Sequence, residues 1–252
     1  MDPYCILHLD EDILVADKLA PIPIQKEKSG DRSLQELLVA ELQAQGQSGF
    51  LEATHRIDRR ASGAVIFART AKSLSTLDAA FRDHRIEKRY VACIERELDP
   101  PSGRLEHELL WDRRRNVVRA RATPTAHSAP IPPPPDSPGS RGDRRPQHAI
   151  LEYRSVGRSD RYFFVEISLI TGRHHQIRAQ LAAVGCPIRG DIKYGARRSA
   201  PSGLIMLHAR SLSFGQPRTG ERIEILAPFP ESEPLWQAYA EQAAPPGASP
   251  GA

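Results

Sequence analysis

Apolar positions along the chain follow two periods, and each period predicts a kind of element. Alternating or continuously apolar short runs are typical of strands. Such runs lie at residues 4–8, 13–16, 64–68 and 90–94, twice within 149–170, and near 204–214 and 222–226. Helical spacing occurs between them, but the strands and helices show no regular strand–helix–strand rhythm. The pattern therefore predicts an α+β fold.

Capping signals predict where helices begin. Ser33 with Glu36 forms a capping-box pattern ahead of a leucine-rich amphipathic stretch. Thr70 stands where it can cap a second helix, and a last helix is expected at 231–242.

A further helix is predicted within TGRHHQIRAQLAAVG. Ile177, Leu181 and Val184 share one helical face, and Gly185 stands where a helix ends. Arg178 follows at the edge of that face, so we expect its side chain to reach inward.

Proline marks two segments that we do not expect to join the fold. Residues 123–146 contain eight prolines and 243–252 contain three, out of 22 in the chain. This composition favours extended chain. We therefore predict one domain over 1–230 with a mobile insertion at 123–146, the C-terminal helix at 231–242, and a disordered tail at 243–252.

Composition excludes several classes of protein. The longest uncharged stretch, Ala122–Pro135, is too short and proline-rich to cross a bilayer, and no signal-peptide pattern opens the sequence. Cys5, Cys93 and Cys186 form no CxxC pair and no disulfide framework. We expect a cytoplasmic protein with reduced thiols and no contact with a membrane.

Charge is segregated along the 252 residues, although the net charge is only +4. Residues 1–54 carry a net charge of −6, residues 55–219 carry +14 and residues 220–252 carry −4. A basic middle of this kind fits a surface that meets a polyanion, and it fits equally a set of solvated arginine faces.

Common site motifs are missing from the sequence. It contains no P-loop, no GxGxxG, no GxSxG, and no HxxxH or CxxC spacing. Nucleotide triphosphates, dinucleotides and a metal site therefore have no support from motifs.

The segment HRIDRRASG, residues 55–63, stands out because it places an aspartate between arginines directly before a buried strand. Asp58 could hold an arginine in a structural ion pair. Ion pairs are common and the segment alone favours that interpretation, but Asp58 could also be an ionised carboxylate, held beside cations, that acts as a nucleophile or general base. Local sequence leaves both interpretations open.

Four blocks in order resemble the RluA-type RNA pseudouridine synthases. HRIDRRASG resembles the family's HRLDxxTSG, and KRYVA at 88–92 resembles KxYxA. TGRHHQIR with GCPIRGDIKYG resembles TGRTHQIR…GHPIxGDxxYG, and LHA at 207–209 matches the family's LHA. The departures include KLAP at 18–21 in place of KPxG, Ala61 in place of threonine, and His174 in place of threonine.

The resemblance implies a fold and an activity. The fold would be the pseudouridine synthase catalytic fold, with a central mixed, largely antiparallel sheet, flanking helices and loops, and a basic active-site cleft. The reaction would convert specific uridines in structured RNA to pseudouridine without a metal or cofactor. Asp58 would be the catalytic carboxylate, Arg178 its partner and Tyr90 the ring against the target base; Leu207 would form an apolar wall of the uracil pocket.

Arginines would complete the RNA interface. Arg56 is a candidate to fill the space left by the flipped nucleotide, and Arg59, Arg60 and Arg173 are candidate phosphate contacts. We expect a monomer whose partner is ribosomal RNA or tRNA. Two other functions stay open: an inactive RNA-binding module using the same cleft, and a hydrolase in which Asp58 works with a second carboxylate.

Overall fold

The computed structural model describes residues 2–19, 21–47, 49–112, 114–122, 145–200 and 202–243. Residues 123–144 of the proline-rich insertion and the tail after 243 lie outside the described residues, so the predictions made for them stay predictions. Arg113 lies outside them as well.

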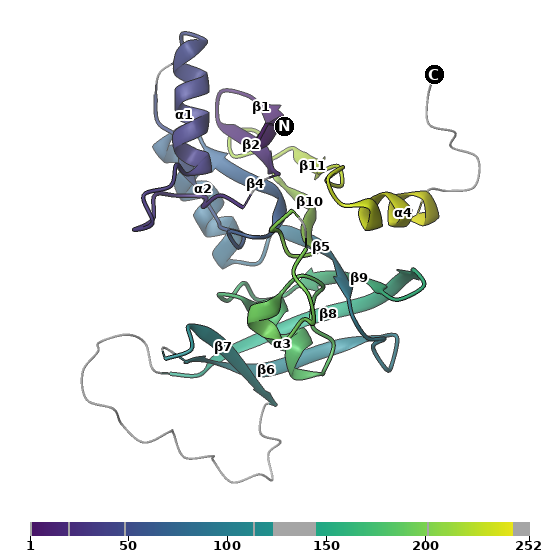
Figure 1. The fold of residues 1–252 in the computed structure, drawn as a ribbon. Helices are drawn as coiled ribbons and strands as arrows, with labels where there is room; N and C mark the ends of the chain where they lie inside the picture. Colours follow the sequence, from purple (N-terminus) through teal and green to yellow (C-terminus); the bar gives the residue numbers. More distant parts are fainter. Residues whose placement is uncertain are drawn as a thin grey trace.

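The described residues form strands, helices and one 3-10 turn (Figure 1). The strands are β1 (Tyr4–Leu9), β2 (Ile13–Lys18), β3 (Glu52–Ala53), β4 (Ser62–Ala68), β5 (Glu87–Ile94), β6 (Ser102–Asp112), β7 (Val117–Ala122), β8 (Gln147–Arg158), β9 (Phe163–Leu169), β10 (Leu207–Gly215) and β11 (Arg222–Leu226). The helices are α1 (Leu34–Ala44), α2 (Ala71–Arg82), α3 (Gln176–Ala183) and α4 (Pro234–Ala243), with a 3-10 turn η1 (Ile192–Tyr194).

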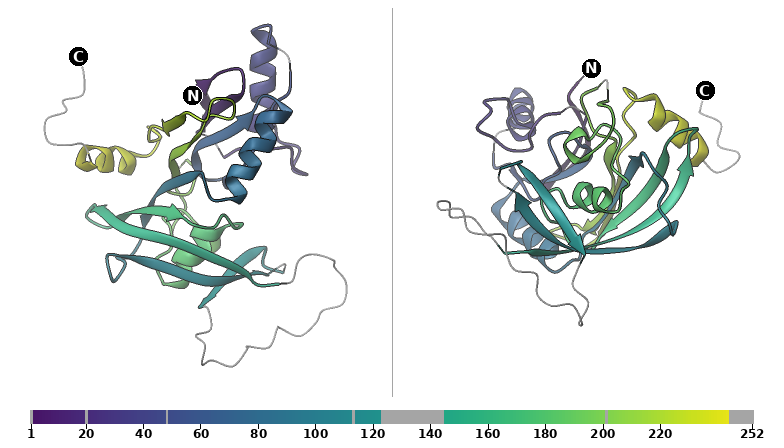
Figure 2. Two further views of the ribbon diagram at one scale, coloured as in Figure 1. Left: turned by 180° about the vertical axis from the view of Figure 1, so that it is seen from behind. Right: turned by 60° about the horizontal axis from the view of Figure 1, so that its bottom comes forward.

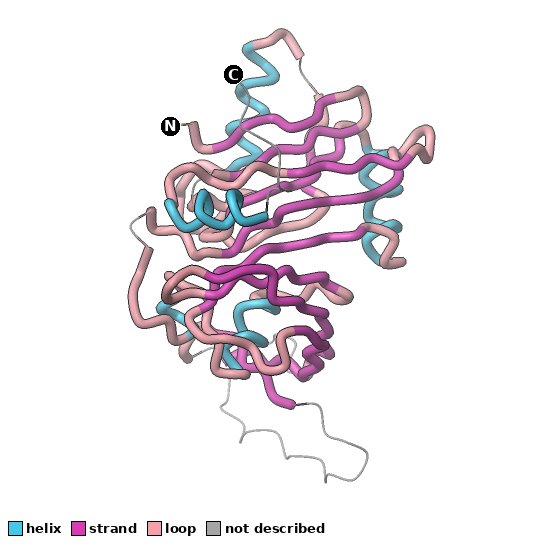
Figure 3. The backbone as a smooth tube through the Cα atoms, turned by 90° about the vertical axis from the view of Figure 1, so that its right-hand side faces the viewer, coloured by secondary structure: helices cyan, strands magenta, loops and turns pink. Residues whose placement is uncertain are grey.

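The strands join into one sheet in the order β1-β2-β4-β10-β5-β9-β8-β6-β7, with β11 added to β10 and β3 to β4. Figure 3 shows these strands lying side by side along the length of the molecule. Among the described strands, β4 and β10 pair in parallel and the other ladders are antiparallel. The expected α+β fold with a mixed, largely antiparallel sheet is confirmed.

The parallel pair brings two distant strands into close contact. Ser62 pairs with His208 and Gly63 with Ala209. Gly63 has φ +114°, and a Cβ built on it would lie 2.4 Å from the backbone of Ala209. Only glycine can occupy this position, which explains the glycine that ends HRIDRRASG.

Both faces of the sheet are covered at β2 and β4, so these two strands are buried along their whole length. Leu14 of β2 and Val65 of β4 pack with the leucines of α1, whereas Ile13 and Ile66 pack on the opposite face with Leu77 of α2. Alternate side chains point to opposite faces of a strand, and this accounts for the continuous apolar runs.

The predicted caps are confirmed. The side chain of Ser33 accepts a hydrogen bond from the N–H of Glu36 at the start of α1, and Thr70 and Ser73 form the equivalent pair at α2. Gly185 follows α3 with φ +76°. The prediction for Val184 is wrong, because α3 ends at Ala183 and the Val184 side chain is exposed.

Helix α3 lies inside the curve of the sheet half formed by β6, β7, β8 and β9 (Figure 2, right). Ala179 of α3 packs with Leu109 of β6 and Val118 of β7. The sequence pattern did not predict β6 and β7, whose apolar residues alternate with charged ones. These strands carry the wall that faces α3.

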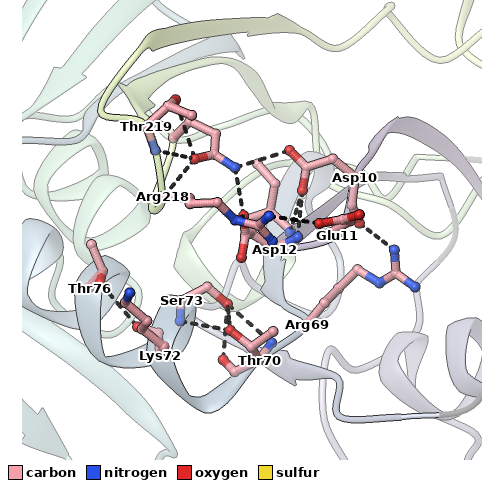
Figure 4. A network of polar contacts seen from close by, with 12 residues as sticks. Asp10, Glu11, Asp12, Arg69, Thr70, Lys72, Ser73, Thr76, Arg218 and Thr219 are labelled. Carbon is pink, nitrogen blue, oxygen red and sulfur yellow. Dashed lines mark hydrogen bonds and ion pairs between the residues drawn. The ribbon is translucent and has the colours of Figure 1, made fainter.

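A polar cluster lies where the β1–β2 turn meets the β10–β11 hairpin (Figure 4). Asp10 accepts hydrogen bonds from the backbone N–H groups of Asp12 and Ile13, which closes the turn. Arg218 Nε lies 2.8 Å from Asp12, and its Nη1 lies 2.7 Å from Glu11. We call Glu11, Asp12 and Arg218 the turn cluster.

Candidate active site

The loop that enters β4 is fixed at both sides of Asp58. Ile66 N–H donates to Nε2 of His55 at 3.0 Å, and burial lowers the pKa of His55 to about 3, so this ring is neutral and accepts a hydrogen bond. Ile57 and Ala61 are buried in the main core. Their burial turns the side chain of Asp58 outward, where 17% of it stays exposed.

Arg178 holds Asp58 from the protein side. Its Nη1 donates to Asp58 Oδ2 at 3.1 Å, while Nε and Nη2 donate to the two carboxylate oxygens of Asp191 at 2.6 and 2.7 Å. The side chain of Arg178 is 5% exposed and that of Asp191 is 1% exposed. A buried guanidinium needs such bidentate pairing, because the desolvation of an unpaired charge is costly.

The electrostatics of Arg178 follow from this pairing. Burial alone would lower the pKa of Arg178, but the hydrogen bonds and charges of Asp191 and Asp58 outweigh burial and raise it. The guanidinium is therefore always charged. The inward reach predicted for Arg178 is confirmed, and Asp191 is the partner to which the sequence analysis gave no role.

Tyr194 and His175 complete the wall behind Asp58. The guanidinium of Arg178 lies 4.7 Å from the centre of the Tyr194 ring, and the Tyr194 hydroxyl accepts from Val118 N–H at 2.9 Å. That hydroxyl also forms a 2.8 Å hydrogen bond with Nδ1 of His175, whose Nε2 lies 3.9 Å from Asp58 Oδ1. Burial and the charge of Arg178 lower the pKa of His175 to about 2, so its ring is neutral.

Tyr90 and Leu207 lie on the adjacent strands β5 and β10. Tyr90 pairs with Ala209, and Leu207 pairs with Ala92. Both side chains are buried, and burial together with the charge of Asp58 raises the pKa of Tyr90. The phenol is therefore protonated, and it lies within electrostatic reach of Asp58.

Lys18 at the end of β2 is a residue whose role sequence reasoning missed. It is fully buried, and its Nζ donates to the backbone oxygen of Arg59 at 2.8 Å. Burial lowers the pKa of Lys18 to about 7, against the opposing charges of Asp58 and Asp17. The sequence offered one signal for Lys18, because it is the lysine of KLAP, the block that resembles KPxG.

The four arginines expected to contact RNA differ in their surroundings. Arg56 and Arg60 are exposed. Arg173 is exposed and its Nε donates to the backbone oxygen of His148 at 3.2 Å. Arg59 is bound within the protein, to the Pro21 carbonyl at 3.0 Å and to Asp31 at 2.7 Å.

Positive charge gathers beside Asp58. Burial lowers the pKa of His174, the charge of Asp58 opposes that shift, and the charges of Arg56, Lys193 and Arg178 reinforce it. These cations come from three separate segments of the chain, which the fold brings together.

Asp58, His174 and His175 offer possible metal-ligand atoms within 4.8 Å of one another. The two imidazole rings are stacked, with centroids 3.9 Å apart and planes at 21°. Lone pairs of nearly parallel rings run side by side and do not converge on one ion at roughly 2.0–2.1 Å. Arg178 also occupies the other oxygen of Asp58. This arrangement does not fit a metal, and the expectation of a metal-free site stays a prediction.

Two surface hollows lie elsewhere, along α1, and neither contains a residue of the Asp58 site. In the described part of the chain, no helix has the length and apolarity needed to span a membrane.

Comparison with known proteins identifies the family. The family model described as RNA pseudouridylate synthase matches residues 12–183, which is well over half of the chain. The chain belongs to the RNA pseudouridylate synthase family. It is an isomerase of the RluA type, so the resemblance drawn from the four blocks is confirmed.

Relatives in this family cover most of the chain. It is 28% identical over 233 residues to an uncharacterized RNA pseudouridine synthase of Mycobacterium tuberculosis, spanning 89% of this chain and 69% of the relative. It is 29% identical over 247 residues to ribosomal large subunit pseudouridine synthase C of Vibrio cholerae, spanning 95% of this chain and 68% of the relative.

Solved structures show the same fold. Human RNA pseudouridylate synthase domain containing 4 superposes with a TM-score of 0.70 at 20% identity, covering 94% of this chain and 92% of that one. Human RNA pseudouridylate synthase domain containing 1 gives a TM-score of 0.69 at 22% identity, covering 95% and 90%. The pseudouridine synthase fold is therefore shown.

Proposed function

We propose that this pseudouridine synthase isomerises uridines in structured RNA with Asp58 as its catalytic carboxylate. One observation carries the proposal: Arg178 binds Asp58 on its buried side and is itself held by Asp191, while Asp58 stays partly exposed. The arrangement keeps an anion fixed beside a buried cation and still reachable from outside.

The reaction breaks the bond between uracil N1 and ribose C1′ and joins C5 of the same base to that carbon. Asp58 either forms a covalent adduct with the ribose or base, or assists departure of uracil and stabilises the species formed. The hydrogen at C5 is released to water in both routes. Because the product is an isomer of the substrate, the atoms balance without a redox partner, and we propose that no metal or cofactor takes part.

Tyr90 and Leu207 would receive the flipped base. An aromatic ring contributes about 1–3 kcal/mol by stacking on a base, and the protonated hydroxyl of Tyr90 can help move the C5 proton. Leu207 would supply an apolar wall. Both roles fit their positions on neighbouring strands beside the Asp58 loop.

RNA must present an extruded uridine, since a stacked one cannot reach a carboxylate that is mostly buried. In this proposal Arg56 fills the vacated space, and Arg60 and Arg173 contact phosphates. Arg59 reaches a phosphate by exchanging Asp31 for it. The substrate class is ribosomal RNA or tRNA; the Vibrio cholerae relative's name makes large-subunit ribosomal RNA the first to test. We further propose a cytoplasmic monomer.

The test is release of tritium from RNA labelled at uracil C5. Wild-type protein should release tritium from ribosomal RNA or tRNA, and Asp58→Asn should release none above background. Asp12→Asn is the matched control, because Asp12 also pairs with an arginine but belongs to the turn cluster. It should retain wild-type release.

Other outcomes overturn the proposal. RNA binding without release from either RNA class would favour an inactive binding module, and free uracil as product would indicate a hydrolase. Full release by Asp58→Asn would remove Asp58 from the chemistry.

A further inference from the structure

Trp111 is an exposed indole at the edge of the Asp58 site. On β6, His107 and Leu109 are buried on the side that faces α3, where His107 lies 3.1 Å from Gln180. Trp111 continues the same face of the strand beyond the buried cluster and is 41% exposed.

A row of rings connects Trp111 to the carboxylate. The Trp111 ring meets His174 edge to face at 5.2 Å between centroids. His174 stacks on His175 at 3.9 Å, and His175 lies 3.9 Å from Asp58. His174 is exposed, whereas His175 is held by Tyr194. The outer two rings of the row, Trp111 and His174, are thus open to a ligand that approaches Asp58.

His174 is particular to this chain when it is set against the motif it resembles. TGRHHQIR has histidine where TGRTHQIR has threonine. The substitution adds a ring that a packed core does not require, since the side chain is exposed. The exposed arginines Arg56 and Arg173 lie within a few residues of Asp58 and His174 in sequence, and Arg56 acts electrostatically on His174.

We propose that Trp111, with His174 inclined to it at 61°, offers a stacking platform for a nucleobase next to the target uridine. This inference rests on the proposed function, because it places the neighbouring nucleotide of the same RNA strand. Unstacked bases in RNA loops bind by stacking on aromatic side chains, with preferences that follow stacking strength. A purine therefore binds the platform better than a pyrimidine.

Fluorescence tests the platform directly. The chain has two tryptophans, and the other, Trp236, is buried against Phe164 and Phe229. Trp236→Phe keeps an aromatic core residue and leaves Trp111 as the only indole. The probe is an RNA stem–loop with one loop uridine between two adenosines, and the control RNA has abasic sites in place of both adenosines.

With the adenosine RNA, the Trp111 emission should be quenched and shielded from iodide. With the abasic RNA, anisotropy should still report binding through the phosphates, but the emission should be unchanged. Unchanged emission with saturating adenosine RNA, or equal quenching by both RNAs, would overturn the proposal.

Variants supply a functional readout. Trp111→Ala should raise KM for RNA by roughly 5- to 150-fold, the range that corresponds to the loss of one stacked base, and should abolish the preference for a flanking purine. Trp111→Phe should restore most of the affinity for RNA and most of the purine preference. His174→Thr should give an intermediate KM. A lowered melting temperature of Trp111→Ala together with an intact purine preference would show that Trp111 has only a structural role.

The two proposals fail differently. Quenching by the adenosine RNA without tritium release would overturn the proposed reaction and keep the platform. Tritium release without quenching would overturn the platform and keep the proposed reaction.

Discussion

The molecule contains two clusters of carboxylates and arginine that have similar distances but differ in the burial of the arginine. In the turn cluster, Arg218 lies 2.7 and 2.8 Å from its partners, but its side chain is 54% exposed. In the Asp58 site, Arg178 is buried and lies at 2.6 to 3.1 Å from its partners. Water screens the charges of Arg218 and Glu11, although the Asp12 side chain is only 11% exposed, whereas the second cluster depends on its own pairing.

The difference shows that an ion-pair distance does not mark a functional site. Burial of the arginine, a second carboxylate behind it and partial exposure of the first carboxylate are what distinguish the Asp58 site, which we propose to be catalytic. The turn cluster has the distance without the burial of its arginine. It fits the structural ion pair that local sequence left open for Asp58.

The largest effect is expected for Arg178→Met. The substitution leaves Asp191 buried without its partner, which costs about 3–5 kcal/mol of stability. It also removes a fixed cation beside Asp58, so tritium release should slow by roughly 10²–10³-fold. Urea unfolding and the release assay measure the two effects. Wild-type stability and a wild-type rate of tritium release in Arg178→Met would contradict the distinction between the two clusters.

Asp191→Asn should have the next largest effect. The amide keeps the space but loses charge-assisted hydrogen bonds worth about 1.5–3 kcal/mol, so release at saturating RNA should slow by roughly 10- to 100-fold. KM should change little, because Asp191 is buried behind Arg178 and does not face RNA. An increase in KM without slower release at saturating RNA would show that Asp191 does not help to hold Asp58.

Acid should destabilise the Asp58 side of the molecule. The folded-state pKa of His55 is lowered to about 3 and that of His208 to about 4, against an ordinary 6.5 in the unfolded chain. As pH falls below 6.5 the unfolded state takes up these protons first. The free energy of unfolding should then fall by up to about 1.4 kcal/mol per pH unit for each histidine.

His55→Gln checks this assignment, because glutamine can accept the Ile66 N–H bond without titrating. Urea unfolding between pH 6.5 and pH 4 should give a shallower slope for the variant than for wild type. Identical slopes would show that His55 does not carry the acid sensitivity.

The smallest effect is expected in the turn cluster. Arg218→Met removes two ion pairs of an arginine that is 54% exposed, and Gln216 Nε2 still donates to Asp12 at 2.9 Å, so tritium release should equal that of wild type and the melting curve should shift only slightly. A slowed reaction would show that the two clusters are coupled across the sheet.

Local sequence predicted elements better than contacts. The core strands 64–68 and 90–94 and the caps at Ser33 and Thr70 were visible because apolar runs and capping pairs are short-range signals. The strands β6 and β7 were missed because charged residues interrupt their apolar positions. Val184 was misassigned because periodicity cannot tell that a helix ends one residue earlier.

The site was visible from its motifs and not from its geometry. Asp58, Tyr90 and Arg178 came from blocks of resemblance, and their roles are proposals still. Asp191 and Lys18 lay within the same kinds of blocks without a role, because no local rule pairs a buried charge with a residue many positions away. The parallel contact of β4 with β10 is equally invisible, since it joins residues 146 positions apart.

That contact has a consequence for the timing of activity. A chain made from its N-terminus presents Asp58 and Tyr90 well before Leu207 and the strand that seats Gly63. The nascent protein thus holds its proposed catalytic aspartate but no assembled site. On the proposed roles, RNA modification therefore begins only after β10 has docked on β4 and seated Gly63.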